Sequence, residues 1–165
     1  ASVDEIELTW NYINGAEEYE IEWTWVDAYD EGGEALIRSA NDLNFSDLDF
    51  KNNSTRIRSS HNSYRISNVF AKGYLIYRVR GIGRWLDEPT KEKFTKWSSD
   101  DAPNQTVADW APHRILITED HIDALNWQYQ ATYAEEGKKK EVAQYFDGSL
   151  RGRQTVTKIN SENCL

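Results

Sequence analysis

Two short runs near the N-terminus constrain the fold of this chain more than any other feature, because apolar and polar residues alternate strictly in both. The runs cover residues 5–10 and 18–25, and a polar turn around Asn14 and Gly15 separates them. A period of two sends alternate side chains to opposite faces of a strand. The runs therefore predict two antiparallel strands that share one buried face and one face in water. The apolar positions are Ile6, Leu8, Trp10, Tyr19, Ile21, Trp23 and Trp25.

Further strand patterns follow, with turn residues between them, so residues 1–100 predict an all-β antiparallel β-sandwich. One short helix is expected over residues 34–43, and the charged, proline-containing segment 87–96 predicts a loop. The strands are expected at residues 50–58, 63–69 and 75–80, and a last short strand begins at Trp97.

The rest of the chain has a different character. Residues 101–118 are polar with two prolines, which predicts a linker. Residues 119–165 predict a β-meander whose last strand reaches the end of the chain. A meander this short has little core of its own, so we expect it to pack on the first domain or to require further strands. Its strands are expected at residues 125–133, 142–146 and 153–159.

Composition limits the possible functions. The chain holds 28 acidic and 19 basic residues, a formal net charge of −9, and such a surface repels nucleic-acid phosphates and anionic membranes. No apolar stretch approaches the ~20 residues of a membrane-spanning helix, so no membrane insertion is expected. Cys164 is the only cysteine, which leaves no internal disulfide framework. Because the chain starts with alanine and lacks methionine, we expect a fragment or a processed form.

No catalytic constellation is evident in the sequence. The three histidines lie in predicted loops or the linker, at no spacing that links them to a nucleophile. Two acidic clusters lack the regular spacing of a calcium loop and predict solvated loops, although calcium binding there stays open. We therefore predict a non-enzyme with no catalytic residue, no cofactor and no metal. The histidines are His61, His113 and His121, and the acidic clusters are Asp27, Asp30 and Glu31, and Asp42, Asp47 and Asp49.

Aromatic residues in or near loops are the candidate contact residues. They are Trp85, Phe94, Trp97 and Trp110. Such side chains could stack on a sugar or on a partner protein, but aromatic residues also dominate cores and domain contacts. The sequence favours packing for each of them, and their number leaves a binding surface open.

Arginines on the run 75–80 could instead suggest an anion site. Alternation places Arg78 and Arg80 on the outer face of their strand, within reach of the glutamates at 18, 20 and 22 on a neighbouring strand. Cross-strand charge pairs of this kind contribute ~0.2–1 kcal/mol each. The sequence therefore favours a structural charge ladder.

The first hundred residues resemble fibronectin type III domains. The stretch Ile6-Glu7-Leu8-Thr9-Trp10 looks like strand B, and residues 15–23 look like the following loop and strand C. Tyr77-Arg78-Val79-Arg80-Gly81-Ile82-Gly83 looks like strand F, and Trp97-Ser98-Ser99 like the start of strand G. Two features depart from the family pattern: a longer segment between strands C and F, and Leu75 where the corner tyrosine is expected.

The C-terminal stretch resembles the segment that leads into the repeats of Rhs/YD-repeat proteins, as found in large surface or secreted proteins of Bacteroidota. Residues 134–142 and Tyr145-Phe146-Asp147-Gly148-Ser149-Leu150-Arg151 carry this resemblance. In that family the repeats form a β shell that can enclose a toxic domain, and type IX secretion is common.

The two resemblances together imply a non-catalytic structural or interaction module that acts as a spacer, a cap or a docking surface. They imply a secreted or cell-surface location. Partners would be neighbouring domains of the same polypeptide, and possible further partners are the secretion machinery or another surface protein. A carbohydrate-binding module that uses loop aromatics is the alternative.

Overall fold

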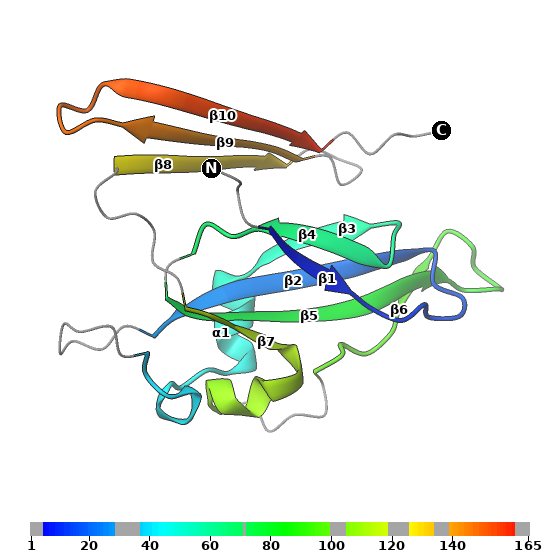
Figure 1. The fold of residues 1–165 in the computed structure, drawn as a ribbon. Helices are drawn as coiled ribbons and strands as arrows, with labels where there is room; N and C mark the ends of the chain where they lie inside the picture. Colours follow the sequence, from blue (N-terminus) through cyan, green and yellow to red (C-terminus); the bar gives the residue numbers. More distant parts are fainter. Residues whose placement is uncertain are drawn as a thin grey trace. The chain divides into compact units, whose positions relative to one another are not determined.

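The computed structural model describes residues 5–28, 37–70, 72–99, 105–118, 126–133 and 139–160 (Figure 1). The chain divides into two compact units, Ala1–Glu119 and Asp120–Leu165, and each is described by itself. The first unit holds two antiparallel sheets and the second a three-stranded antiparallel sheet. The predicted fold class, an all-β sandwich followed by a β-meander, is confirmed.

The sandwich of the first unit consists of a small sheet and a larger one. The small sheet pairs β1 (Glu5–Thr9) with β4 (Ser63–Ser67). The larger sheet has the order β3-β2-β5-β6. Its strands are β3 (Thr55–Ser59), β2 (Glu18–Asp27), β5 (Gly73–Arg84) and β6 (Glu92–Phe94).

The outer edge of β5 is paired by two separate strands. β6 pairs with Ile82–Arg84, and β7 (Arg114–Ile117) pairs with Gly73–Ile76. Between these strands, Ser98 donates its N–H to the carbonyl of Val79 at 2.9 Å. The chain then leaves the edge and returns to it as β7. The edge strand beside β5 is therefore interrupted between Ser98 and Arg114, and we call the described part of this segment, residues 105–113, the insert.

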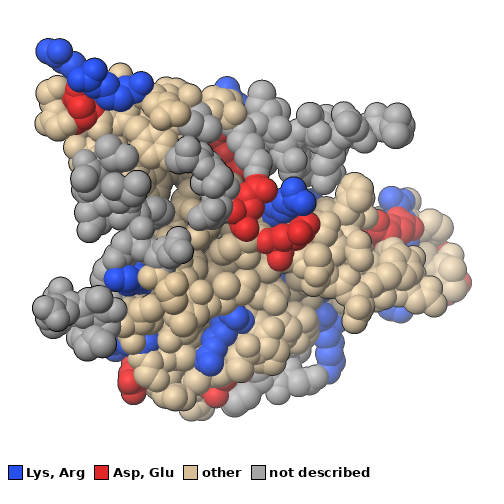
Figure 2. All heavy atoms as spheres, in the orientation of Figure 1, with Lys and Arg blue, Asp and Glu red and all other residues tan. Residues whose placement is uncertain are grey.

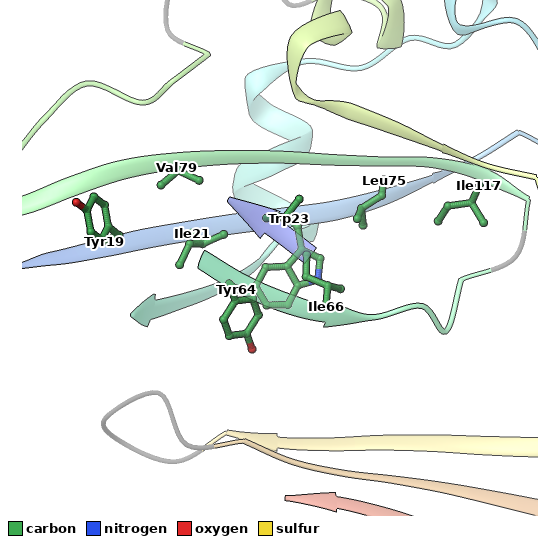
Figure 3. Packing of buried hydrophobic residues seen from close by; sticks show 9 residues of the cluster. Tyr19, Ile21, Trp23, Tyr64, Ile66, Leu75, Val79 and Ile117 are labelled. Atoms are coloured by element: carbon green, nitrogen blue, oxygen red, sulfur yellow. The ribbon is translucent and has the colours of Figure 1, made fainter. Parts of the chain in front are cut away.

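The core between the two sheets follows the alternation seen in the sequence. Tyr19, Ile21 and Trp23 of β2 point toward Tyr64 and Ile66 of β4 (Figure 3). The rings of Trp23 and Tyr64 lie 5.5 Å apart between centroids. The predicted buried face is thus present, with Leu8, Leu75, Val79 and Ile117 completing it.

The opposite face of the larger sheet is covered as well, so the prediction of one wet face is wrong. Glu22 and Ile76, which point away from the sandwich core, are both 0% exposed. Helix α1 (Asp47–Asn53) and two 3-10 helices, η1 (Ala40–Asp42) and η2 (Val107–His113), supply the cover. The described apolar residues of this second core are Ala28, Ala40, Leu43, Phe45, Phe50, Tyr74, Ile76, Val107 and Trp110.

Helix α1 falls where the sequence predicted the start of a strand over 50–58. Ser46 and Asp49 form a capping box, in which the Asp49 carboxylate accepts from the Ser46 backbone N–H at 2.7 Å. That cap starts a helix and buries Phe50, and only the segment from Thr55 onward is a strand. The predicted helix over 34–43 is also wrong in its described part, because residues 37–43 contain only the three-residue η1.

The segment 101–118, predicted as a linker, belongs in its described part to the first unit. Thr106 and Asp109 form a second capping box that starts η2. The backbone N–H of Val107 then donates to Leu43 at 2.8 Å, which ties the insert to the chain before α1. Since β7 also pairs with β5, residues 105–118 are structural parts of the sandwich.

One turn fixes the loop between β1 and β2 against the end of β5. Gly15 has φ +82, a left-handed conformation that favours glycine. A Cβ atom on Gly83 would lie 2.4 Å from the Gly15 carbonyl oxygen. The backbone conformation therefore favours glycine at position 15, and the close approach requires it at position 83.

The second unit is the predicted three-stranded meander. It consists of β8 (Asn126–Tyr133), β9 (Lys139–Phe146) and β10 (Gly152–Asn160), in the order β10-β9-β8. Asp147 organises the β9–β10 turn, because its carboxylate accepts from the N–H groups of Ser149 and Arg151 at 3.0 Å each. The Ser149 hydroxyl also donates to this carboxylate, at 2.7 Å. This hydrogen bond, followed by those from the backbone, lowers the pKa of Asp147.

Candidate functional site

The richest concentration of charged and aromatic side chains lies on the second face of the larger sheet. Glu20 stands opposite Arg58 of β3 and Arg80 of β5, and Glu22 stands opposite Arg56 and Arg78. Each glutamate is therefore flanked by an arginine on both neighbouring strands. The predicted charge ladder is present, although Glu18 contributes only a 3.9 Å contact to Arg58.

Glu22 is the centre of this ladder. Its carboxylate accepts from Arg56 Nε on one oxygen and from Arg78 Nε on the other, both at 2.6 Å. Arg78 also donates to Asp47 at the start of α1, at 3.2 Å. The side chains of Glu22 and Arg78 are 1% and 6% exposed. Buried charges survive in a protein when they are paired and hydrogen-bonded, and this network meets that condition.

Aromatic rings are stacked between the arginines. The guanidinium of Arg78 lies 4.6 Å from the ring centroids of both Phe50 and Trp97. The guanidinium of Arg80 lies 4.3 Å from those of Trp97 and Phe94. The result is a column in the order Phe50, Arg78, Trp97, Arg80, Phe94. Cation–π contacts of this kind contribute from about 0.5 to 2 kcal/mol, depending on desolvation.

The open end of the ladder is a bidentate ion pair. Arg58 donates to both carboxylate oxygens of Glu92, at 2.6 and 3.0 Å. The hydrogen bond from Arg58 lowers the pKa of Glu92, and the same bond raises the pKa of Arg58. Both groups therefore stay charged over a wide pH range. On the face drawn in Figure 2, acidic and basic side chains lie next to each other in several places.

The four candidate contact residues do not form one platform. Trp110 is 0% exposed in the second core, so its prediction as a contact residue is wrong. Trp97 and Phe94 have ring faces occupied by arginines. Trp85 is 45% exposed beside the Lys93 ammonium, which lies 4.6 Å from its ring centroid. Of the four, Trp85 is the one whose ring is most open to a partner.

Five exposed large apolar residues of the described part of the chain were not among the sequence candidates: Tyr12, Leu48, Leu86, Leu116 and Leu150. Leu86, next to Trp85 in the β5–β6 hairpin, is 98% exposed, and Tyr12 in the β1–β2 loop is 70% exposed. Hairpin residues Trp85 and Lys91 are joined by a 3.3 Å backbone hydrogen bond. The Trp85-Leu86 pair between charged residues is the sequence signal that could have identified this tip.

The histidines and acidic residues that the structure describes have structural surroundings. His113 Nε2 lies 2.9 Å from the Ser98 carbonyl oxygen, and its ring packs on Tyr77. Burial raises the pKa of Tyr77. Asp47 and Asp49 serve the ladder and the α1 cap, and no group of three or more potential metal ligands occurs among the described residues. His121, Asp30, Glu31 and Cys164 lie outside the described residues.

No family model, curated protein or solved structure matches this chain. In the described parts of the chain, every helix is too short or too polar to span a bilayer.

Proposed function

We propose that this protein is a non-catalytic structural or interaction module, a fibronectin type III-like sandwich followed by a β element of the Rhs/YD-repeat type. In this proposal it acts as a spacer, cap or docking surface in a large secreted or cell-surface protein. Its partners are then neighbouring domains of the same polypeptide.

The observation that carries the proposal is that the charged side chains on the second face of the larger sheet are paired with one another and covered by aromatic rings. Glu20, Glu22, Arg78 and Arg80 are held by one another and by the aromatic column. Covered charge networks of this kind serve the fold, whereas a binding site presents its polar groups to a ligand. A sandwich whose charged face is paired within itself suits a spacer or a cap.

The strand arrangement adds support for the fibronectin type III-like part. The segments expected as strands B, C and F correspond to β1, β2 and β5, and β2 and β5 are neighbours in the larger sheet. In the second unit, Asp147 fixes the turn that follows Tyr145, as expected for a hairpin unit with a Tyr-Asp turn.

The downstream gene sequence is the sharpest test of the family assignment. Regular Tyr-Asp-x-x-Gly-Arg units encoded after residue 165 would support it. A continuation without such units would remove the Rhs/YD part of the proposal and leave the sandwich as a module of another kind.

A carbohydrate-binding module is the second candidate, and the exposure of Trp85 favours it. Tryptophan fluorescence titrated with a glycan panel tests it, with Trp85→Phe as the matched variant. A flat response supports the structural proposal. Saturable quenching that Trp85→Phe abolishes would replace it with the carbohydrate-binding one.

A further inference from the structure

The loop between β1 and β2 holds the single asparagine–glycine pair of the sequence, Asn14-Gly15. The pair occupies the two central positions of a turn, which the Ala16 N–H closes by donating to the Ile13 carbonyl at 3.0 Å. Gly15 has φ +82, as at the third residue of a type II turn. Both residues of the pair are exposed, and a Cβ atom on Gly15 would meet no atom within 4 Å. The pair therefore lies in open surroundings at the surface.

The peptide group between Asn14 and Gly15 has freedom to rotate. Among the hydrogen bonds of the described residues, none engages this peptide group. The bond that closes the turn uses the peptide groups on either side of it, so a rotation breaks no hydrogen bond of the turn. Glycine accepts both orientations because it has no Cβ atom. The backbone nitrogen of Gly15 can therefore approach the side-chain carbonyl carbon of Asn14.

Two other exposed asparagines of the first unit differ in this respect. The backbone N–H that follows Asn44 donates to Gln105 at 3.0 Å, and the one that follows Asn53 donates to Phe50 at 3.1 Å. A hydrogen-bonded N–H is held in place with its proton. In both cases the following residue also carries a side chain, which restricts the backbone. The structure therefore separates Asn14 from asparagines that are equally exposed.

We propose that Asn14 is a site of spontaneous deamidation, a modification that needs water and no enzyme. The Gly15 backbone nitrogen loses its proton to water and bonds to the Asn14 side-chain carbonyl carbon. The bond from that carbon to Nδ2 breaks, and the nitrogen takes up a proton and leaves as ammonia. Water then opens the resulting succinimide ring at one of its two carbonyl groups, so that residue 14 becomes an aspartate or an isoaspartate.

The two products have different effects on the loop. Aspartate adds a negative charge at an exposed position, whereas isoaspartate also lengthens the main chain by a methylene group. A Cβ atom on Gly81 would lie 3.1 Å from the Ala16 side chain and 3.3 Å from that of Ile13, and Gly83 approaches the Gly15 carbonyl still more closely. A longer main chain cannot keep these close contacts in register, so isoaspartate should loosen the loop from β5.

Ageing of the full 165-residue chain at mildly alkaline pH tests the site, with peptide mapping by mass spectrometry as the readout at each asparagine. In the folded chain, Asn14 should convert on the order of tenfold faster than Asn44 or Asn53, because a hydrogen-bonded N–H and a following side chain slow the reaction there. Unfolding in guanidinium chloride frees every N–H, so it should speed conversion at Asn44 and Asn53 and leave the rate at Asn14 nearly unchanged. A folded-state rate at Asn14 no higher than at the other two, or a rate that rises about tenfold on unfolding, would overturn the proposal.

Asn14→Gln is the matched control, because a glutamine keeps the amide but would have to close a larger ring. A charge change that appears in Asn14→Gln as fast as in the parent chain would place the reaction elsewhere and overturn the proposal. Ion exchange separates the converted chains for thermal unfolding. The isoaspartate fraction should unfold at a lower temperature than Asn14→Asp, which carries the charge without the longer main chain. Equal midpoints for these two would overturn the proposed loosening of the loop.

Discussion

The two faces of the β2–β5 pair come from the same two strands, yet they are filled by opposite chemistry. On one face Ile21 is 0% exposed among apolar side chains, and on the other Glu22 is 0% exposed among arginines. The comparison shows that burial alone does not require apolar residues. It requires that each buried charge has partners, and β3, β5 and α1 supply them to Glu22 and Arg78.

The two faces also differ in how much stability the fold should lose when one buried side chain is removed. An apolar face that loses a side chain gains a cavity, whereas a charged face that loses one partner keeps an uncompensated charge in a poorly solvated place. Removing a buried charged side chain from the second face should therefore lower the free energy of unfolding at least as much as removing a buried apolar side chain from the first.

The largest effect is expected for Glu22→Ala. It leaves Arg78 buried without its main partner, and breaking a buried ion pair in this way costs about 3–5 kcal/mol. Chemical denaturation measures the loss in the free energy of unfolding. Glu18→Ala is the matched control, because Glu18 is 48% exposed and its contact with Arg58 is long, so a change of about 0–1 kcal/mol is expected. Equal effects of the two variants would contradict the role of Glu22.

The double variant Glu22→Leu/Arg78→Met sharpens this test. Replacing both members of a buried pair by apolar residues is often neutral or stabilising by about 1–4 kcal/mol. The exposed partners, Arg56 and Asp47, can turn to water. The double variant should therefore be far more stable than Glu22→Ala alone.

On the apolar face, Ile21→Ala should cost about 2–5 kcal/mol, because Ile21 is fully enclosed between the sheets. Ile21→Val removes one methyl group and should cost about 0.5–1.5 kcal/mol. Denaturant midpoints at equal m-values measure both. A loss for Ile21→Ala below that for Ile21→Val would mean that the site collapses around the missing side chain.

A smaller effect is expected for Trp97→Leu, which removes the ring between Arg78 and Arg80 and leaves a smaller apolar side chain. The three lost cation–π contacts, with Arg78, Arg80 and the more distant Arg56, predict a cost of about 1–2 kcal/mol in the free energy of unfolding. Trp97→Phe retains an aromatic face and should recover most of it. Thermal unfolding of the two variants side by side distinguishes a cation–π contribution from simple packing, for which leucine and phenylalanine would behave alike.

The smallest effect concerns pH and the cap of η2. Backbone hydrogen bonds from Thr106 and Gln105 lower the pKa of Asp109 in the folded state. A lowered pKa contributes stability that is present above the unfolded-state value, near 4, and is lost as pH falls through the folded-state value. The thermal midpoint should therefore fall in acid, and Asp109→Asn should reduce that dependence. An unchanged slope would show that the cap carries no pH-dependent stability.

The sequence predicts the apolar face well, because alternation over β1, β2 and β5 reports directly which side chains share a face. It does not predict the cover of the other face. Glutamates and arginines at alternate positions are compatible with water as well as with a paired network, so the pattern on β2 and β5 leaves both open. The covering side chains also come from distant segments, Phe50 in a short capped helix and Trp110 in a proline-containing insert.

The candidate contact residues lie in or near predicted loops, and two features of the fold hide their surroundings from the sequence pattern. The insert returns to the sheet as β7, so Trp110 lies within the fold and not in a linker. Trp97 and Phe94 face arginines of β5 and, at longer distances, arginines of β3. The sequence pattern does not identify Leu86 as a contact residue, because a single leucine in a polar hairpin gives no periodic signal.

The interrupted edge strand has a mechanical consequence. Tension applied to the chain after Ile117 would load β7 first, and β7 holds Gly73–Ile76 of β5 independently of β6, which holds Ile82–Arg84. Once β7 detaches, the load passes to the insert, which Val107 and Trp110 anchor in the second core, while β6 and the β2–β5 pair remain in place. Single-molecule extension would register this as a short event before the main rupture, and a single rupture event would exclude it.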